Sequence, residues 1–228
     1  MNVPFDAIAA SLFALGLLLA VLAVRGILRF FRTGARSQIG WGSGLALAAA
    51  AMFVEGIVYV GFVDSPLLQA YVFFSAAIVG VLSLGATRVL KSPRLESIYS
   101  FYTLAACGAV ALACAVTPLP DAMVTGGIIA GNPPLILLLL SSFVTVPATI
   151  LLLAATFLSL KRSGRWQTIL MAAGAITLGA GGTLYIASFP IALYYAEFLG
   201  ILMLFGGLVS LPQTAPGHAA AGTTSGTG

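Results

Sequence analysis

Long apolar segments constrain this chain more than any other feature. Residues 134–160, for example, contain no charged side chain. A helix of about 20 apolar residues crosses the hydrocarbon core of a bilayer, because it satisfies its own backbone hydrogen bonds there. The chain is 60% hydrophobic and 7% charged, whereas a soluble globular domain carries about 25% charged residues. The sequence therefore predicts an integral membrane protein, with the lipid bilayer of the plasma membrane as its surroundings.

Turn and charge signals between the apolar segments predict an all-α bundle of seven transmembrane helices over residues 1–211. Asp64-Ser65-Pro66 forms one such break. Pro147 lies deep within a span, where it frees one backbone carbonyl and is expected to kink the fifth helix. Residues 212–228 are small and polar, so we expect a disordered cytoplasmic tail. The predicted spans cover residues 5–28, 41–63, 67–89, 97–117, 134–160, 167–188 and 191–211.

The basic residues are segregated in a way that predicts the orientation of the bundle. All ten lie in or beside the first, third and fifth predicted connections, and cytoplasmic loops are enriched in Lys and Arg. The N-terminus is therefore expected outside and the C-terminus in the cytoplasm. This placement also argues against nucleic acid as a partner, although the formal net charge is +4. The ten residues are Arg25, Arg29, Arg32, Arg36, Arg88, Lys91, Arg94, Lys161, Arg162 and Arg165.

The connection over residues 118–134 is the only long one on the predicted outer side. Its glycines and prolines argue against a rigid element, although a short surface helix is compatible with the sequence near Asp121. Two interpretations stay open, a lid over the bundle and a simple connector.

Small residues within the spans predict surfaces where helices approach one another closely. They are Gly40, Gly42, Gly44, Ala105, Ala109, Ala113, Gly174, Gly179, Gly181 and Gly182.

Two acidic residues inside predicted spans supply the candidate functional site. Glu55 lies nine residues before Asp64, or about 13 Å along a helix, and Glu197 lies seven residues after Pro190, or about 10 Å. Both are therefore expected at a similar depth in the outer half of the bilayer, where the sequence offers no Lys or Arg. Other polar residues fall at a comparable depth and complete the candidate set: Tyr59, Tyr71, Ser75, Ser141, Thr145, Tyr185 and Tyr194.

An acid near the centre of a membrane helix costs about 2.5–3.5 kcal/mol on insertion scales. Three states reduce this cost: a protonated carboxyl bonded to a hydroxyl, one proton shared by both glutamates, or a water-filled cavity that holds a cation or a basic solute. We therefore expect a transporter or binding protein for a proton, a cation or a small solute. In the alternatives, the glutamates serve packing alone, and the chain is a membrane subunit, sensor or assembly partner that binds another membrane protein.

The segment GTLYIASFPIALYYAEFLGILMLFGG, residues 182–207, is similar to uncharacterised bacterial seven-helix membrane proteins, a family that implies no activity. The predicted topology also resembles that of microbial rhodopsins. Residues 191–211 contain no lysine for retinal, however, so that activity is excluded. Sugar transporters of the SWEET type share the topology as well, but aligning Arg36 with Arg165 reveals no internal repeat.

The sequence argues against an enzyme and predicts no cofactor and no metal site. The single histidine, His218, lies in the tail, and no Ser-His pair or zinc-ligand spacing occurs in the spans. Cys107 and Cys114 are separated by about 10 Å along a helix, which exceeds the Cα separation of about 7 Å that a disulfide bridges.

Overall fold

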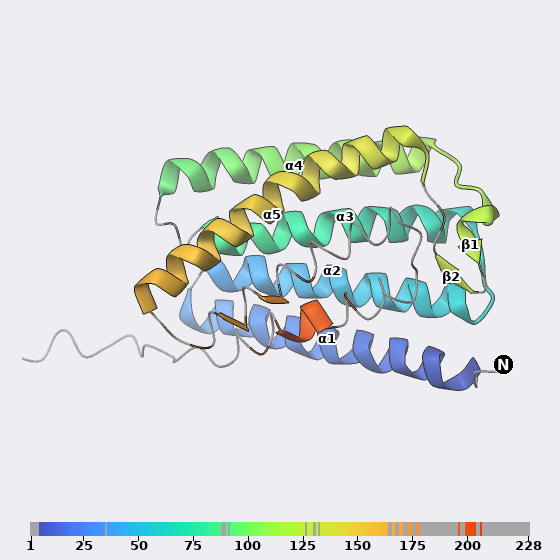
Figure 1. The fold of residues 1–228 in the computed structure, drawn as a ribbon, viewed down its shortest axis with the longest axis horizontal. Coiled ribbons are helices and arrows are strands. Elements are labelled where there is room, and N and C mark those ends of the chain that lie inside the picture. Colours follow the sequence, from blue (N-terminus) through green and yellow to red (C-terminus); the bar gives the residue numbers. More distant parts are fainter. Residues whose placement is uncertain are drawn as a thin grey trace, which may run out of the picture.

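The computed structural model describes residues 5–34, 36–87, 90, 92–125, 127–129, 131 and 133–163, together with 166, 169–170, 173–174, 177, 196, 199–203 and 206. Over these residues, five helices are long and apolar enough to cross a membrane, so the chain is a multi-pass membrane protein as predicted (Figure 1). Most of the sixth and seventh predicted spans lies outside the described residues, and the total of seven stays a prediction. The five helices are α1 (Phe5–Thr33), α2 (Arg36–Tyr59), α3 (Ser65–Thr87), α4 (Pro93–Val116) and α5 (Leu135–Ser163).

Consecutive helices run in opposite directions and pack in sequence order. The helices α1 to α4 form a row in which each contacts the next, and α5 crosses α3 and α4 obliquely on one side of that row (Figure 1). The connections 33–36 and 87–93 therefore lie at one end of the bundle, which we name the basic end. The connections 59–65 and 116–135 lie at the other, which we name the hairpin end.

Glycines end two of the helices by adopting positive φ. At Gly34 (φ 65°), the backbone N–H donates to the carbonyl of Phe30, which satisfies the last turn of α1. After α2, the N–H groups of Gly61 (φ 106°) and Phe62 donate to the carbonyls of Val58 and Ile57. This paired arrangement is a Schellman motif, and it ends α2 at Tyr59 rather than at the predicted residue 63.

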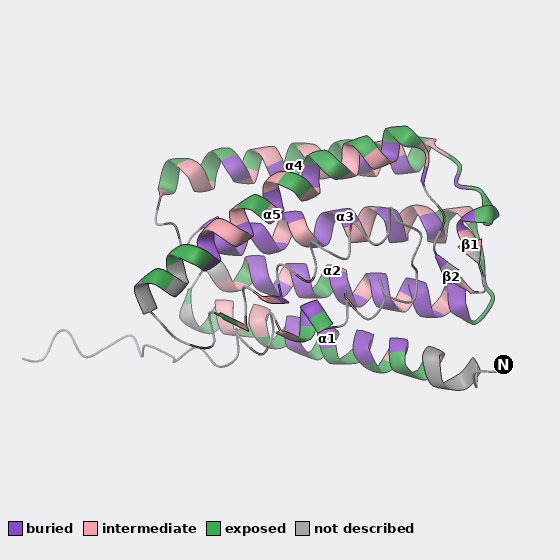
Figure 2. Ribbon diagram, in the orientation of Figure 1, coloured by how far each residue is buried: buried purple, intermediate pink, exposed green. Residues whose placement is uncertain are grey.

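Glycines also let α2 approach both neighbouring helices closely, as predicted for Gly40, Gly42 and Gly44. A Cβ atom at Gly40 would lie 2.8 Å from the backbone nitrogen of Gly85 in α3. A Cβ at Gly42 would lie 3.1 Å from the backbone nitrogen of Ile27 in α1. Close backbone contact replaces side-chain packing here, and it makes α2 the most buried of the five helices (Figure 2).

The predicted packing role of the α4 alanines is only partly right. Ala105 and Ala109 are exposed, and Ala113 is half-buried. Ala113 packs against the core cluster that contains Leu68 of α3, whereas Ala105 and Ala109 do not, and α4 lies at the edge of the row (Figure 2). Among the remaining predicted small residues, Gly174 is buried, whereas Gly179, Gly181 and Gly182 lie outside the described residues.

The connection between α4 and α5 is folded, which corrects the expectation that it lacks a rigid element. It contains a short 3-10 helix, η2 (Asp121–Met123), and a two-residue antiparallel ladder of β1 (Val124–Thr125) and β2 (Ile128–Ile129). We name residues 121–131 the hairpin. Its Met123 and Ile129 side chains are buried. Just before the hairpin, the N–H of Leu119 donates to the Ser65 hydroxyl at 3.1 Å. The hairpin is therefore anchored to the helix ends.

We predict that Gly40→Ala destabilises the bundle by about 1–3 kcal/mol, because the added methyl group must push α2 away from the backbone of α3. The matched control is Gly108→Ala in α4, where a Cβ would meet no heavy atom within 4 Å. Both substitutions gain the same helix propensity, so their difference isolates the steric effect. Unfolding in mixed detergent, followed by circular dichroism, gives both values. Equal stability of the two variants would contradict the packing role of Gly40.

Candidate functional site

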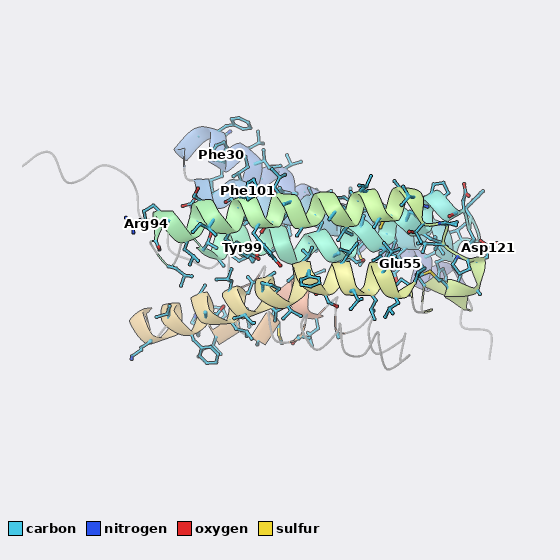
Figure 3. All side chains as sticks on the ribbon, turned by 90° about the horizontal axis from the view of Figure 1, so that it is seen from above. Phe30, Glu55, Arg94, Tyr99, Phe101 and Asp121 are labelled. Carbon is cyan, nitrogen blue, oxygen red and sulfur yellow. The ribbon has the colours of Figure 1, made fainter. Side chains whose placement is uncertain are left out.

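Glu55 is a buried carboxylic acid inside a membrane-spanning helix. Its side chain is only 5% exposed, and it lies four residues before the end of α2. That distance is one helical turn, or about 6 Å, so Glu55 lies closer to the helix end than the sequence predicts. Figure 3 shows Glu55 toward the end of the bundle that carries Asp121 and away from the end that carries Arg94.

Tyr59 lies one turn beyond Glu55 on the same helix and is also buried. The turn of the hairpin covers it: a Cβ atom at Gly127 would lie 3.3 Å from the carbonyl oxygen of Tyr59. Gly127 has a φ of 81°, a conformation that a side chain would strain. The hairpin thus covers the end of α2 at Tyr59, one helical turn from Glu55.

The candidate residues of α3 and α5 differ in burial and in their contacts. Tyr71 is buried in a core cluster with Val58 and Leu68, and Ser75 is half-buried. Ser141 is half-buried and its hydroxyl donates to the carbonyl of Leu138 at 3.0 Å, within its own helix. Thr145 is half-buried. Tyr59 belongs to a second core cluster, so Tyr59 and Tyr71 do not share one.

Three predicted site residues, Tyr185, Tyr194 and Glu197, lie outside the described residues, as does any contact between the two glutamates. Near Glu197 in the seventh predicted span, the structure describes residue 196, which is half-buried, and the segment 199–203. Its Ile201 is buried in the same core cluster as Tyr59 and Met52. That segment therefore packs against the cluster to which α2 contributes beside Glu55.

No group of three or more His, Cys, Asp or Glu side chains with the geometry of a metal site occurs among the described residues. Cys107 and Cys114 are both free thiols.

A buried polar contact between α3 and α4 was not expected from the sequence. The Ser83 and Tyr99 hydroxyl oxygens lie 2.7 Å apart, and both residues are buried. The Ser83 hydroxyl donates to the carbonyl of Gly80 at 2.6 Å, so the Tyr99 hydroxyl donates to Ser83. A tyrosine near a helix end is usual at a membrane interface, and position alone does not distinguish that role from a buried one.

A second tyrosine compensates for the proline in α5. Proline has no backbone N–H, so Pro147 leaves the carbonyl of Phe143, four residues earlier, without its helical donor. The Tyr102 hydroxyl of α4 donates a hydrogen bond to that carbonyl. Within a bilayer this donor cannot be replaced by bulk water, so the bond joins α4 and α5 at the level of the proline.

Comparison of the chain with protein-family models, with curated proteins and with solved structures gave no match. What the protein does must therefore be inferred from the burial, charge and contacts of its own residues.

We predict that Tyr102→Phe lowers the free energy of unfolding by about 0.6–1.7 kcal/mol, the range measured for interhelical hydrogen bonds in a membrane protein. The loss should shrink in a Pro147→Ala background, because alanine restores the N–H donor to the Phe143 carbonyl. A double-mutant cycle, measured by unfolding in mixed detergent, reports this coupling. The same cost in both backgrounds would show that the Phe143 carbonyl does not depend on Tyr102.

Proposed function

We propose that this membrane protein binds a proton, a cation or a small basic solute at Glu55 and transports it. One observation carries the proposal: a carboxylic acid is buried within a membrane-spanning helix, one turn below a helix end that the hairpin covers. Ionisable residues inside membrane spans mark solute, ion or proton pathways more often than they mark packing sites.

The proposed chemistry follows from the cost of charge in hydrocarbon. A carboxyl group at the depth of Glu55 is stable when it carries a proton, and it is stable as a carboxylate when water or a cation accompanies it. Exchange between these two states gives a binding step that depends on pH. Glu197 is proposed as a second member of the site, and Ile201, four residues later, packs in the cluster that contains Tyr59.

The orientation of the bundle bears on the side from which the site is reached. In the described part of the chain, five basic residues belong to the helix halves nearest the basic end: Arg25, Arg29, Arg32, Arg94 and Lys161. By the enrichment of Lys and Arg in cytoplasmic loops, we propose that the basic end faces the cytoplasm. The hairpin then lies outside, as does the shorter route to Glu55, and we propose that the hairpin acts as a lid on that route.

The test is a flux measurement in liposomes, with protons, Na⁺ and methylammonium as separate probes. An enclosed pH-sensitive dye reports the movement of protons and methylammonium, and a radioactive tracer reports that of Na⁺. We expect wild-type protein to accelerate the movement of at least one probe and Glu55→Gln to abolish that movement, because glutamine keeps the shape but cannot ionise. The matched control is Glu96→Gln, the same change in the first turn of α4 at the opposite end of the bundle.

Two results would refute transport at Glu55. One is wild-type flux equal to that of empty liposomes for all three probes. The other is a flux that Glu55→Gln leaves unchanged. Circular dichroism of each variant establishes that a lost flux is not a lost fold.

A second candidate function is that of a non-transporting subunit that assembles with another membrane protein. The exposed small residues of α4, Ala105, Gly108 and Ala109, favour it, because small residues let a foreign helix approach closely. A stoichiometric membrane protein that co-purifies in mild detergent, together with absent flux, would support this function over transport.

A further inference from the structure

An apolar crevice opens between α4 and α5, away from the Glu55 site. Its volume is about 400 Å³, within the range of about 300–1,000 Å³ that ligand pockets occupy. Its walls include Leu95, Ile98 and Tyr102 of α4, and Pro147, Ile150 and Leu151 of α5.

The crevice follows from the way α4 and α5 are joined. The Tyr102 hydroxyl donates to the Phe143 carbonyl, and Leu137 and Val144 of α5 pack in the same core cluster as Val110 of α4. After Pro147, α5 leaves α4 (Figure 1), and its Leu152 and Ala155 join the other core cluster, which contains Leu82 of α3. The two helices therefore diverge toward the basic end.

The lining suits a hydrocarbon chain. Its aromatic hydroxyls are engaged inside the protein, since Tyr99 bonds to Ser83 and Tyr102 bonds to the carbonyl of Phe143. Ile98 is 70% exposed and Ile150 is 61% exposed, so the crevice is open to the side of the bundle, where the bilayer lies. What remains available in the crevice is apolar surface, which acyl chains fill without loss of hydrogen bonds.

One basic residue flanks the crevice toward the basic end. Arg94 is exposed, precedes the lining residue Leu95 in the first turn of α4, and lies one helical turn before the lining residue Ile98. Figure 3 shows Arg94 at that end of α4.

We propose that this crevice is a binding site for one anionic phospholipid. Its acyl chains lie against Ile98, Tyr102 and Ile150, and its phosphate lies at the basic end near Arg94. The pairing of an apolar crevice with a cation at its end matches a lipid, whose hydrocarbon and charge are separated in the same order. A transmembrane helix of a partner protein would also fill the apolar part, but it need not place a negative charge beside Arg94. The proposal is independent of transport at Glu55.

The experiment uses the full chain, delipidated in detergent and titrated with phosphatidylglycerol or with phosphatidylcholine of the same acyl chains. Native mass spectrometry counts the bound lipids. We expect one phosphatidylglycerol to bind more tightly than later ones, and more tightly than phosphatidylcholine. A basic residue near an anionic lipid surface is worth about 1 kcal/mol, so Arg94→Gln should weaken that first binding about fivefold.

Two further variants distinguish a specific lipid site from general attraction of anionic lipids to the basic end. Arg32→Gln removes the same charge from the exposed last turn of α1, on the far side of the row, and should leave the first binding unchanged. Ile150→Trp fills the open crevice and should weaken the first binding of both lipids, with circular dichroism as the check on folding.

The proposal is overturned if phosphatidylglycerol and phosphatidylcholine bind equally, or if Arg32→Gln has the same effect as Arg94→Gln. It is also overturned if Ile150→Trp folds and binds the first lipid as wild type does. Co-purification of a second protein whose cross-links map to Ile98 and Ile150 would assign the crevice to a partner helix instead.

Discussion

The close approach of α2 to α1 and α3 is the contact on which the rest of the bundle depends. Within a bilayer, apolar side chains gain little from leaving lipid for protein, so helices associate where their backbones come near enough for extensive van der Waals contact. Gly40, Gly42 and Gly44 provide that proximity on two sides of one helix. This contact makes α2 central, and a central helix brings its polar residue, Glu55, into the interior.

Several features of the fold could be predicted because they depend on local sequence. The apolar runs identify the first five spans, since crossing a bilayer requires length and hydrophobicity but little else. The helices are longer than the predicted spans at two boundaries: α1 continues to Thr33 rather than residue 28, and α4 begins at Pro93 rather than residue 97, where Ser92 caps it. The end of α2 was misplaced: Val60 to Val63 are apolar, but Gly61 turns the chain before the apolar run is complete.

The candidate site was predictable only in part, because some of its contacts join residues that are distant in the sequence. The burial of Glu55, Tyr59 and Tyr71 could be expected, because polar side chains within apolar membrane helices usually face the interior of the bundle. The folded hairpin depends on Met123 and Ile129 finding a pocket among distant helix ends, and the Tyr102 hydrogen bond pairs residues 41 positions apart. The exposure of Ala105 and Ala109 depends on the position of α4 at the edge of the row, which helical periodicity does not specify.

The division of the core into two clusters has a mechanical consequence for α5. Leu137 and Val144 of its first half pack in the cluster that contains Met123 of the hairpin, whereas Leu152 and Ala155 of its second half pack in the cluster that contains Leu82 of α3. Between these anchors lies Pro147, where one rung of the helical ladder is missing. Of all points along α5, this one therefore bends at the lowest cost, and it stands between the part of the helix that packs with the hairpin and the part that packs nearer the basic end.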